Sequence, residues 1–112
     1  MNEFLLVFRR DYKTKSLRPS PDEIKTHIAH WENWYGDLEA NGVITIPPQE
    51  IEQVGKIVRG LQQPKIGPFR KNKKSLGGFV TILADNYESA VEIAKGCPIL
   101  ELNGNVEVRK IY

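Results

Sequence analysis

The sequence predicts an α+β domain of the ferredoxin-like class, in which two helices cover one face of an antiparallel sheet. The chain has 112 residues, which is the size of one compact domain, so we expect a single domain over residues 1–112. Its apolar residues follow strand-like and helix-like periods in the order strand, long helix, two strands, helix, strand. Helix-start signals precede both helical stretches.

The first predicted strand covers residues 2–9, an apolar run with no Gly or Pro, and we expect it to be buried. Residues 11–18 are polar and aperiodic, which predicts a mobile loop. A helix follows, because Ser20 is a typical N-cap, Pro21 suits the first helical position and Glu23 completes a capping box. Asn41 and Gly42 end this helix, since both tolerate the left-handed conformation.

An apolar stripe along this helix predicts the face that lies on the sheet. Its members recur at spacings of three and four residues, which return to one side of a helix. They are Ile24, Ile28, Trp31, Tyr35 and Leu38.

The middle of the chain predicts two strands and a basic loop. Residues 43–46 form a short or edge strand that Pro47 and Pro48 cut off. Residues 50–59 alternate loosely and predict a strand with a bulge or bend at Gly55. Residues 60–75 form a basic loop, and residues 76–84 are the strongest strand, whose Gly77 and Gly78 suit a bend or a close backbone approach.

The last third predicts a helix and a closing strand. A cap-like pattern at residues 85–88 starts a helix of about ten residues that ends at Lys95 and Gly96. Residues 103–105 form a turn, and residues 106–112 alternate as a strand. With both helices on one face, the other face of the sheet needs a cover. A second copy of the chain would supply it, so we expect a homodimer.

Composition excludes several classes of protein. No apolar run approaches the ~18 residues that a membrane span needs, and the first ten residues do not have the charge order of a signal peptide. A single cysteine, Cys97, excludes an internal disulfide and fits a reducing compartment. We therefore expect a cytoplasmic protein with no membrane partner, and we interpret Cys97 as a small buried residue.

Charge is distributed unevenly along the chain, although the formal net charge is only +2. Residues 53–84 contain seven basic residues and no acidic one, which leaves the rest of the chain acidic. The segment 65–74 has Phe69 as its one aromatic residue, whereas nucleic-acid binding favours a larger basic face with several stacking aromatics. We favour a solvated loop over specific nucleic-acid binding. Capture of a small carboxylate or phosphate by Arg70 with Lys71 or Lys73 lies between the two.

Four short motifs occur in order through the second half of the chain. They are Gly67-Pro68-Phe69, Leu76-Gly77-Gly78-Phe79, Cys97-Pro98 and Val106-Glu107-Val108-Arg109. In this order and spacing they resemble the YCII-related family, also called the DGPF domain family. The resemblance spans nearly the whole chain and implies a dimeric α/β barrel of ferredoxin-like subunits. The biochemical activity of that family is largely undetermined.

The resemblance also bears on site residues. Some members carry an enzyme-like site with a histidine on the first helix near an acidic residue, which aligns with His30 here. The acidic partner has no match, because residues 45–48 stand in its place. In the family's Asp-Gly-Pro-Phe motif, Ile66 replaces the Asp, and Lys71 and Lys74 stand where glutamates would be. If that loop borders a pocket, its ligand is anionic or neutral.

One edge of the first predicted helix gathers side chains that can do chemistry. Glu23, His27, His30 and Trp34 lie along it at helical spacing. A histidine there can act as a general acid or base near neutral pH. The alternative, which we favour, is that His27 packs at the core boundary and His30 is solvated. Zinc is not expected, because two histidines three residues apart without a further ligand make a poor site.

Two functions follow from these observations. In the first, a pocket between the first helix and the sheet binds a small anionic or aromatic metabolite without a cofactor. His27, Trp34, Arg70 and Lys73 would contact the ligand there, and His30 would move a proton if the protein is an enzyme. In the second, the chain is a non-enzymatic regulatory or scaffolding module that binds a partner through the basic loop 65–74.

Overall fold

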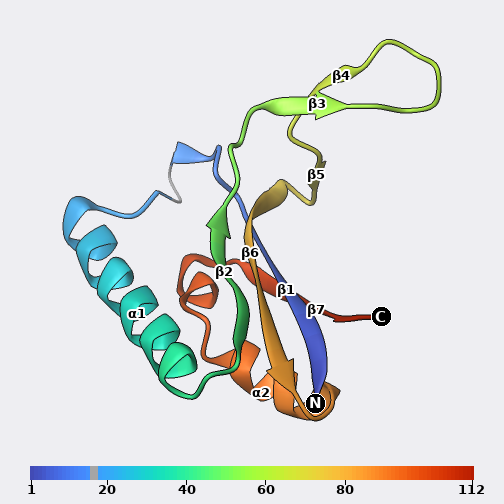
Figure 1. The fold of residues 1–112 in the computed structure, drawn as a ribbon. Coiled ribbons are helices and arrows are strands. Elements are labelled where there is room, and N and C mark those ends of the chain that lie inside the picture. The colour runs from blue at the N-terminus through green and yellow to red at the C-terminus, as the bar shows by residue number, and fades with distance from the viewer. Residues whose placement is uncertain (16–17) are drawn as a thin grey trace.

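The computed structural model describes residues 1–15 and 18–112, so residues 16 and 17 of the predicted loop lie outside the described residues. The main sheet is antiparallel in the order β2-β6-β1-β7, with β5 paired to β6 (Figure 1). The helices are α1 (Pro21–Ala40), α2 (Tyr87–Lys95) and the short 3-10 helix η2 (Pro98–Leu102). The strands are β1 (Asn2–Arg10), β2 (Ile44–Glu50), β3 (Gly55–Ile57), β4 (Lys65–Gly67), β5 (Arg70–Lys71), β6 (Lys74–Ala84) and β7 (Asn105–Ile111). The predicted ferredoxin-like α+β class is confirmed.

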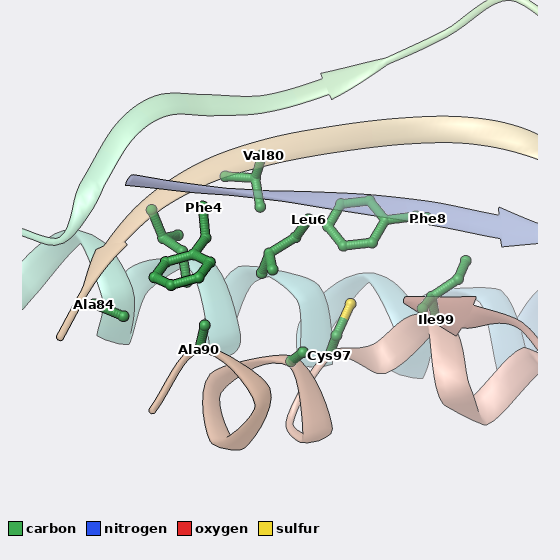
Figure 2. Packing of buried hydrophobic residues seen from close by; sticks show 10 residues of the cluster. Phe4, Leu6, Phe8, Val80, Ala84, Ala90, Cys97 and Ile99 are labelled. Atoms are coloured by element: carbon green, nitrogen blue, oxygen red, sulfur yellow. The ribbon is translucent and has the colours of Figure 1, made fainter. Parts of the chain in front are cut away.

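The hydrophobic core lies between the sheet and the segment α2–η2 (Figure 2). Phe4 and Leu6 of β1 and Val80 and Ile82 of β6 are fully buried. Alternation along each strand sends these four side chains to one face, where they meet the helices. Cys97 is buried in the same cluster, as the sequence predicts, and burial raises the pKa of its thiol to about 12. It therefore packs as a small apolar residue.

Helix α1 begins as its capping signal predicts, but only part of the predicted stripe lies on the sheet. The Ser20 hydroxyl accepts from the Glu23 N–H, and the Glu23 carboxylate accepts from the Ser20 N–H. Leu38 is buried, whereas Ile24 and Ile28 are 43% and 51% exposed. The prediction is wrong for these two residues. The N-terminal half of α1 borders an open cleft instead of packing on the strands.

Strand β2 continues through Pro47 and Pro48 to Glu50, so the prediction that the prolines end it is wrong. β2 is an edge strand, as expected, and among the described residues it pairs with β6 alone. An edge strand has one side without a ladder, where a missing N–H costs no hydrogen bond. Two register shifts between Ile44 and Gln49 also interrupt the pairing with β6.

The predicted strand over residues 50–59 is the largest difference from the sequence analysis. Of these residues, Glu50 ends β2 and Gly55–Ile57 forms β3, which pairs with β4 in a separate two-stranded hairpin. We call residues 54–69 the arm. The arm projects beyond the end of the main sheet (Figure 1). Part of the predicted basic loop is also paired, because Asn72 and Lys73, both at positive φ, form the turn between β5 and β6.

Gly77 and Gly78 serve close approaches, as the sequence predicts. A Cβ on Gly78 would overlap the carbonyl oxygen of Gln49 on β2, and a Cβ on Gly77 would overlap the Tyr12 hydroxyl. Gly78 is therefore required by the neighbouring backbone, whereas a side chain at Gly77 would displace the Tyr12 ring. Among the described residues, no helix is both long and apolar enough to cross a membrane.

Candidate functional site

A cleft of about 1090 Å³ opens between the N-terminal half of α1 and one end of the main sheet. Its walls come from α1, from the chain that follows β1, from the end of β2 and from the start of β6. The volume suits a small molecule, for which clefts of roughly 300–1,000 Å³ are typical. Its lining residues from α1 are Ile24, His27, Ile28, Trp31 and Glu32, and those from the sheet end include Phe8, Arg10, Tyr12, Pro48, Gln49 and Gly77.

Aromatic side chains form much of the inner wall. The rings of Phe8 and Trp31 meet edge to face at 5.2 Å between centroids. Tyr12 lies against the backbone of Gly77, where a larger residue would displace it. Aromatic rings in such arrangements offer flat apolar surfaces to a ligand. Trp34 packs on Phe8 and donates its indole N–H to the Ile93 carbonyl at 3.1 Å, outside the cleft lining.

Arg10 and Arg18 bring positive charge to the cleft, and Glu32, Glu50 and Glu52 bring negative charge to it. The Arg10 guanidinium carbon lies 4.1 Å from the centre of the Tyr12 ring, which is cation–π geometry. Within residues 1–15 and 18–112, Arg10 forms no ion pair. Its donors are thus available to an anionic group of a ligand.

The turn after β1 holds Tyr12 in the cleft through Asp11. The Asp11 carboxylate accepts from the Thr14 hydroxyl at 2.6 Å and from the backbone N–H groups of Thr14 and Lys13 at 3.0 and 2.9 Å. These hydrogen bonds, that from the Thr14 hydroxyl foremost, lower the pKa of Asp11 to about 2. Asp11 is therefore ionised near neutral pH and organises the turn.

His27 lines the cleft, but both of its ring nitrogens are engaged. The Trp31 indole N–H donates to His27 Nε2 at 2.7 Å, so this nitrogen is an acceptor. His27 Nδ1 is therefore the protonated nitrogen of the neutral ring, and it donates to Glu101 Oε2 at 3.2 Å. This arrangement fixes the tautomer and the orientation of the ring. His27 acts here as a half-buried structural group of the cleft wall.

His30 meets the same carboxylate from the next turn of α1. Its Nδ1 lies 2.6 Å from Glu101 Oε1, and its side chain is 47% exposed. With Nδ1 donating to Glu101, His30 Nε2 is the nitrogen left to exchange a proton with another group. His30 does not line the cleft within the described part of the chain.

Glu101, on η2, is one of the residues that the sequence analysis missed. Partial burial raises the pKa of its carboxyl, but the hydrogen bonds from His27 and His30 outweigh this and hold the pKa below the ordinary value of 4.5. It supplies an acidic partner that the sequence analysis did not locate. No local signal points to it, because it lies 71 residues from His30 along the chain.

The remaining predicted ligand contacts lie elsewhere. Arg70 is on β5 and Lys73 is in the turn before β6, and neither lines the cleft. The basic segment 65–74 therefore does not border the cleft in this chain. Residues 1–15 and 18–112 hold no cluster suited to a metal ion. Each of the two histidines is hydrogen-bonded through Nδ1 to the Glu101 carboxylate.

The fold and the cleft together define a small ferredoxin-like α+β domain with a ligand-sized site beside its first helix. The profile of the YCII-related domain matches residues 5–112, nearly the entire chain. The chain therefore belongs to the YCII-related family.

A solved structure shares the fold. It is 5-chloro-2-hydroxyhydroquinone dehydrochlorinase (TftG) from Burkholderia phenoliruptrix AC1100 in complex with 2,5-dihydroxybenzoquinone. The TM-score is 0.51 at 18% identity, and the match covers 97% of this chain and 93% of that one. The search of curated proteins returned no match.

Proposed function

We propose that this protein binds a small, flat ring compound with negatively charged oxygen substituents in the cleft between α1 and the sheet. The observation that carries the proposal is the pairing of aromatic walls with an arginine that has no acidic partner among the described residues. Tyr12 and Trp31 offer ring surfaces, Phe8 packs against Trp31 from within the core, and Arg10 is held over Tyr12. A charged fork of donors beside apolar walls suits an aromatic or quinonoid anion.

The structural neighbour supports the ring class. It is a dehydrochlorinase in complex with 2,5-dihydroxybenzoquinone, a small ring with oxygen substituents. The fold is shared at low identity, so we carry over only the size and flatness of this compound. The residues that would hold the ring here are those of this chain's own cleft.

Binding is favoured over catalysis by the state of the two histidines. His27 Nε2 accepts from Trp31, so it has no lone pair to take a proton from a ligand. His30 Nε2 has a lone pair that can take a proton, but His30 is not among the described residues that line the cleft. In a catalytic version, His30 Nε2 would receive the proton, and the Glu101 carboxylate would stabilise the charged ring.

Calorimetric titration with 2,5-dihydroxybenzoquinone tests the proposal. We expect Arg10→Gln to weaken binding about tenfold or more, because a charge-assisted hydrogen bond is lost. Arg70→Gln is the matched control, and we expect its affinity to equal that of the unaltered protein because Arg70 is outside the cleft. Equal affinities for all three proteins, or no binding at millimolar probe, would overturn the proposal. Loss of turnover in His30→Ala with affinity retained would identify the catalytic version.

We also propose a homodimer, with the open face of the sheet supporting it. Alternation places Leu5, Phe79 and Leu83 on the face opposite the helices, and each is only partly buried. A second copy on this face would remove them from water.

The alternative function, partner binding through residues 65–74 in a non-enzymatic role, draws support from the exposed Ile66 and Phe69 of that segment. Reversal of Arg70, Lys71 and Lys74 to Glu separates it from the cleft proposal. A partner-binding module would lose association in this variant, whereas the cleft would keep its affinity for the ring probe.

A further inference from the structure

The arm is the least supported part of the fold. Within the described part of the chain, β3 and β4 pair only with each other, in a sheet separate from the main one (Figure 1). Residues 51–53 form the base of the arm, and hydrogen bonds join this base to the main sheet. The Ile51 N–H donates to the Gly77 carbonyl, and the Gln53 side-chain amide donates to the Leu76 carbonyl. Beyond that base, the arm exposes the apolar side chains of Val54, Val58, Leu61, Ile66 and Phe69.

The molecule as a whole exposes more surface than a compact folded monomer of the same mass. Its accessible surface is 7877 Å², whereas a folded monomer of this mass exposes about 6300 Å². Its radius of gyration is 15.3 Å, against about 13 Å for a compact chain of this length. The excess surface, roughly 1,600 Å², exceeds the roughly 800 Å² that each partner buries in a standard interface. The molecule, from which the arm projects, therefore has enough surface beyond that of a compact chain for a stable contact.

The mouth of the cleft has the complementary character. Ile24, Ile28 and Ile51 line the cleft and are exposed. The same lining holds three glutamates, Glu32, Glu50 and Glu52, and two arginines, Arg10 and Arg18, so its acidic side chains outnumber its arginines by one. The arm carries the opposite charge, because its three charged residues are all basic. These are Lys56, Arg59 and Lys65.

We propose that the arm of one copy covers the mouth of the cleft of a second copy. The apolar side chains of the arm would pack on the exposed isoleucines, and its cations would meet the glutamates of the mouth. Both halves of this contact are present in one chain, so two copies can form it twice about a two-fold axis, in addition to the contact between open sheet faces proposed above. The described arm residues do not line the cleft of their own chain, which leaves that mouth open to a partner.

The inference rests on the proposed cleft function for its consequence, which is enclosure of the ligand. A ring bound between α1 and the sheet would be shielded from water by the partner's arm. Each site would then be complete only in the dimer, and affinity for the ring would rise with protein concentration.

A charge-swap experiment, read by sedimentation velocity without any ligand, tests the contact. The first variant, Lys56→Glu with Arg59→Glu, reverses the charge of the arm. The second, Glu32→Lys with Glu52→Lys, reverses the charge of the cleft mouth. Each places like charges together, so we expect either pair to raise the dimer dissociation constant about tenfold or more. The chain with all four changes regains opposite charges, and we expect it to dimerise within about threefold of the unaltered protein.

The control variant changes the net charge by the same amount away from the arm. Lys95→Glu with Lys110→Glu lies on α2 and β7, and we expect it to leave the dimer unchanged. Three results would each overturn the inference. They are an unaltered chain that is monomeric, an arm variant that dimerises normally, and a variant with all four substitutions that does not regain dimerisation. Because no ligand is present, failure of the ring probe to bind would count against the cleft function alone.

Discussion

Apolar residues are buried at one end of the sheet and exposed at the other. At the α2 end, Phe4 and Ile82 are fully buried, and Phe4 meets Tyr87 edge to face at 4.9 Å. At the cleft end, Ile24 and Ile28 of α1 face an open hollow. The same residue type stabilises the fold at one end and remains available for contact at the other. Stability and recognition are thus carried by different ends of the molecule.

Truncation of one isoleucine at each end is expected to show the largest difference in the free energy of unfolding. Ile82→Ala leaves a cavity in the core, so we expect the free energy of unfolding to fall by about 2–5 kcal/mol. Ile28→Ala removes an exposed side chain, and we expect a change within about 0.5 kcal/mol. Urea unfolding followed by circular dichroism measures both. Similar losses in the two variants would contradict the assignment of stability to the α2 end.

Glycine substitutions extend the comparison to the backbone. A Cβ on Gly78 would overlap the Gln49 carbonyl of β2, so we expect Gly78→Ala to lower the free energy of unfolding by about 1–3 kcal/mol. Gly36 is on α1 and has nothing within 4 Å of an added Cβ. Gly36→Ala is therefore expected to raise stability by about 0.5–1 kcal/mol through helix propensity. If both substitutions stabilised the protein, the close approach of β2 to β6 would be wrong.

The smallest expected effect is the loss of stability in acid that results from protonation of Glu101 at the cleft end. Its folded-state pKa lies below 4.5 because His27 and His30 donate to the carboxylate. The stability it contributes is therefore present above that pH and is lost as the pH falls through the folded pKa. We expect Glu101→Gln to lower the melting temperature near neutral pH and to match the unaltered protein in strong acid.

Glu88→Gln is the control for that titration, since Glu88 is exposed and its carboxylate accepts no side-chain hydrogen bond among the described residues. A deficit of Glu101→Gln that stayed constant from neutral pH to strong acid would show that the carboxylate charge is not the cause.

The sequence predicts the α2 end better than the cleft end, for a physical reason. Core strands and helix caps are local signals, which is why the buried strands and the burial of Cys97 are confirmed, and why the Ser20 cap is confirmed even at the cleft end. The strand expected over residues 50–59 is wrong because alternation does not reveal whether a neighbouring strand exists. Arg10, Tyr12 and Glu101 reach the site through tertiary packing, so no spacing in the chain announces them.

The most direct test of the cleft as a binding site is the pair of indole N–H signals in a nitrogen-15 correlation spectrum. Trp31 lines the cleft, whereas the Trp34 indole is held by the Ile93 carbonyl outside the cleft lining. On titration with 2,5-dihydroxybenzoquinone, we expect the Trp31 signal to move saturably and the Trp34 signal to move much less. A saturating shift confined to Trp34, or no shift in either signal at millimolar probe, would contradict the account.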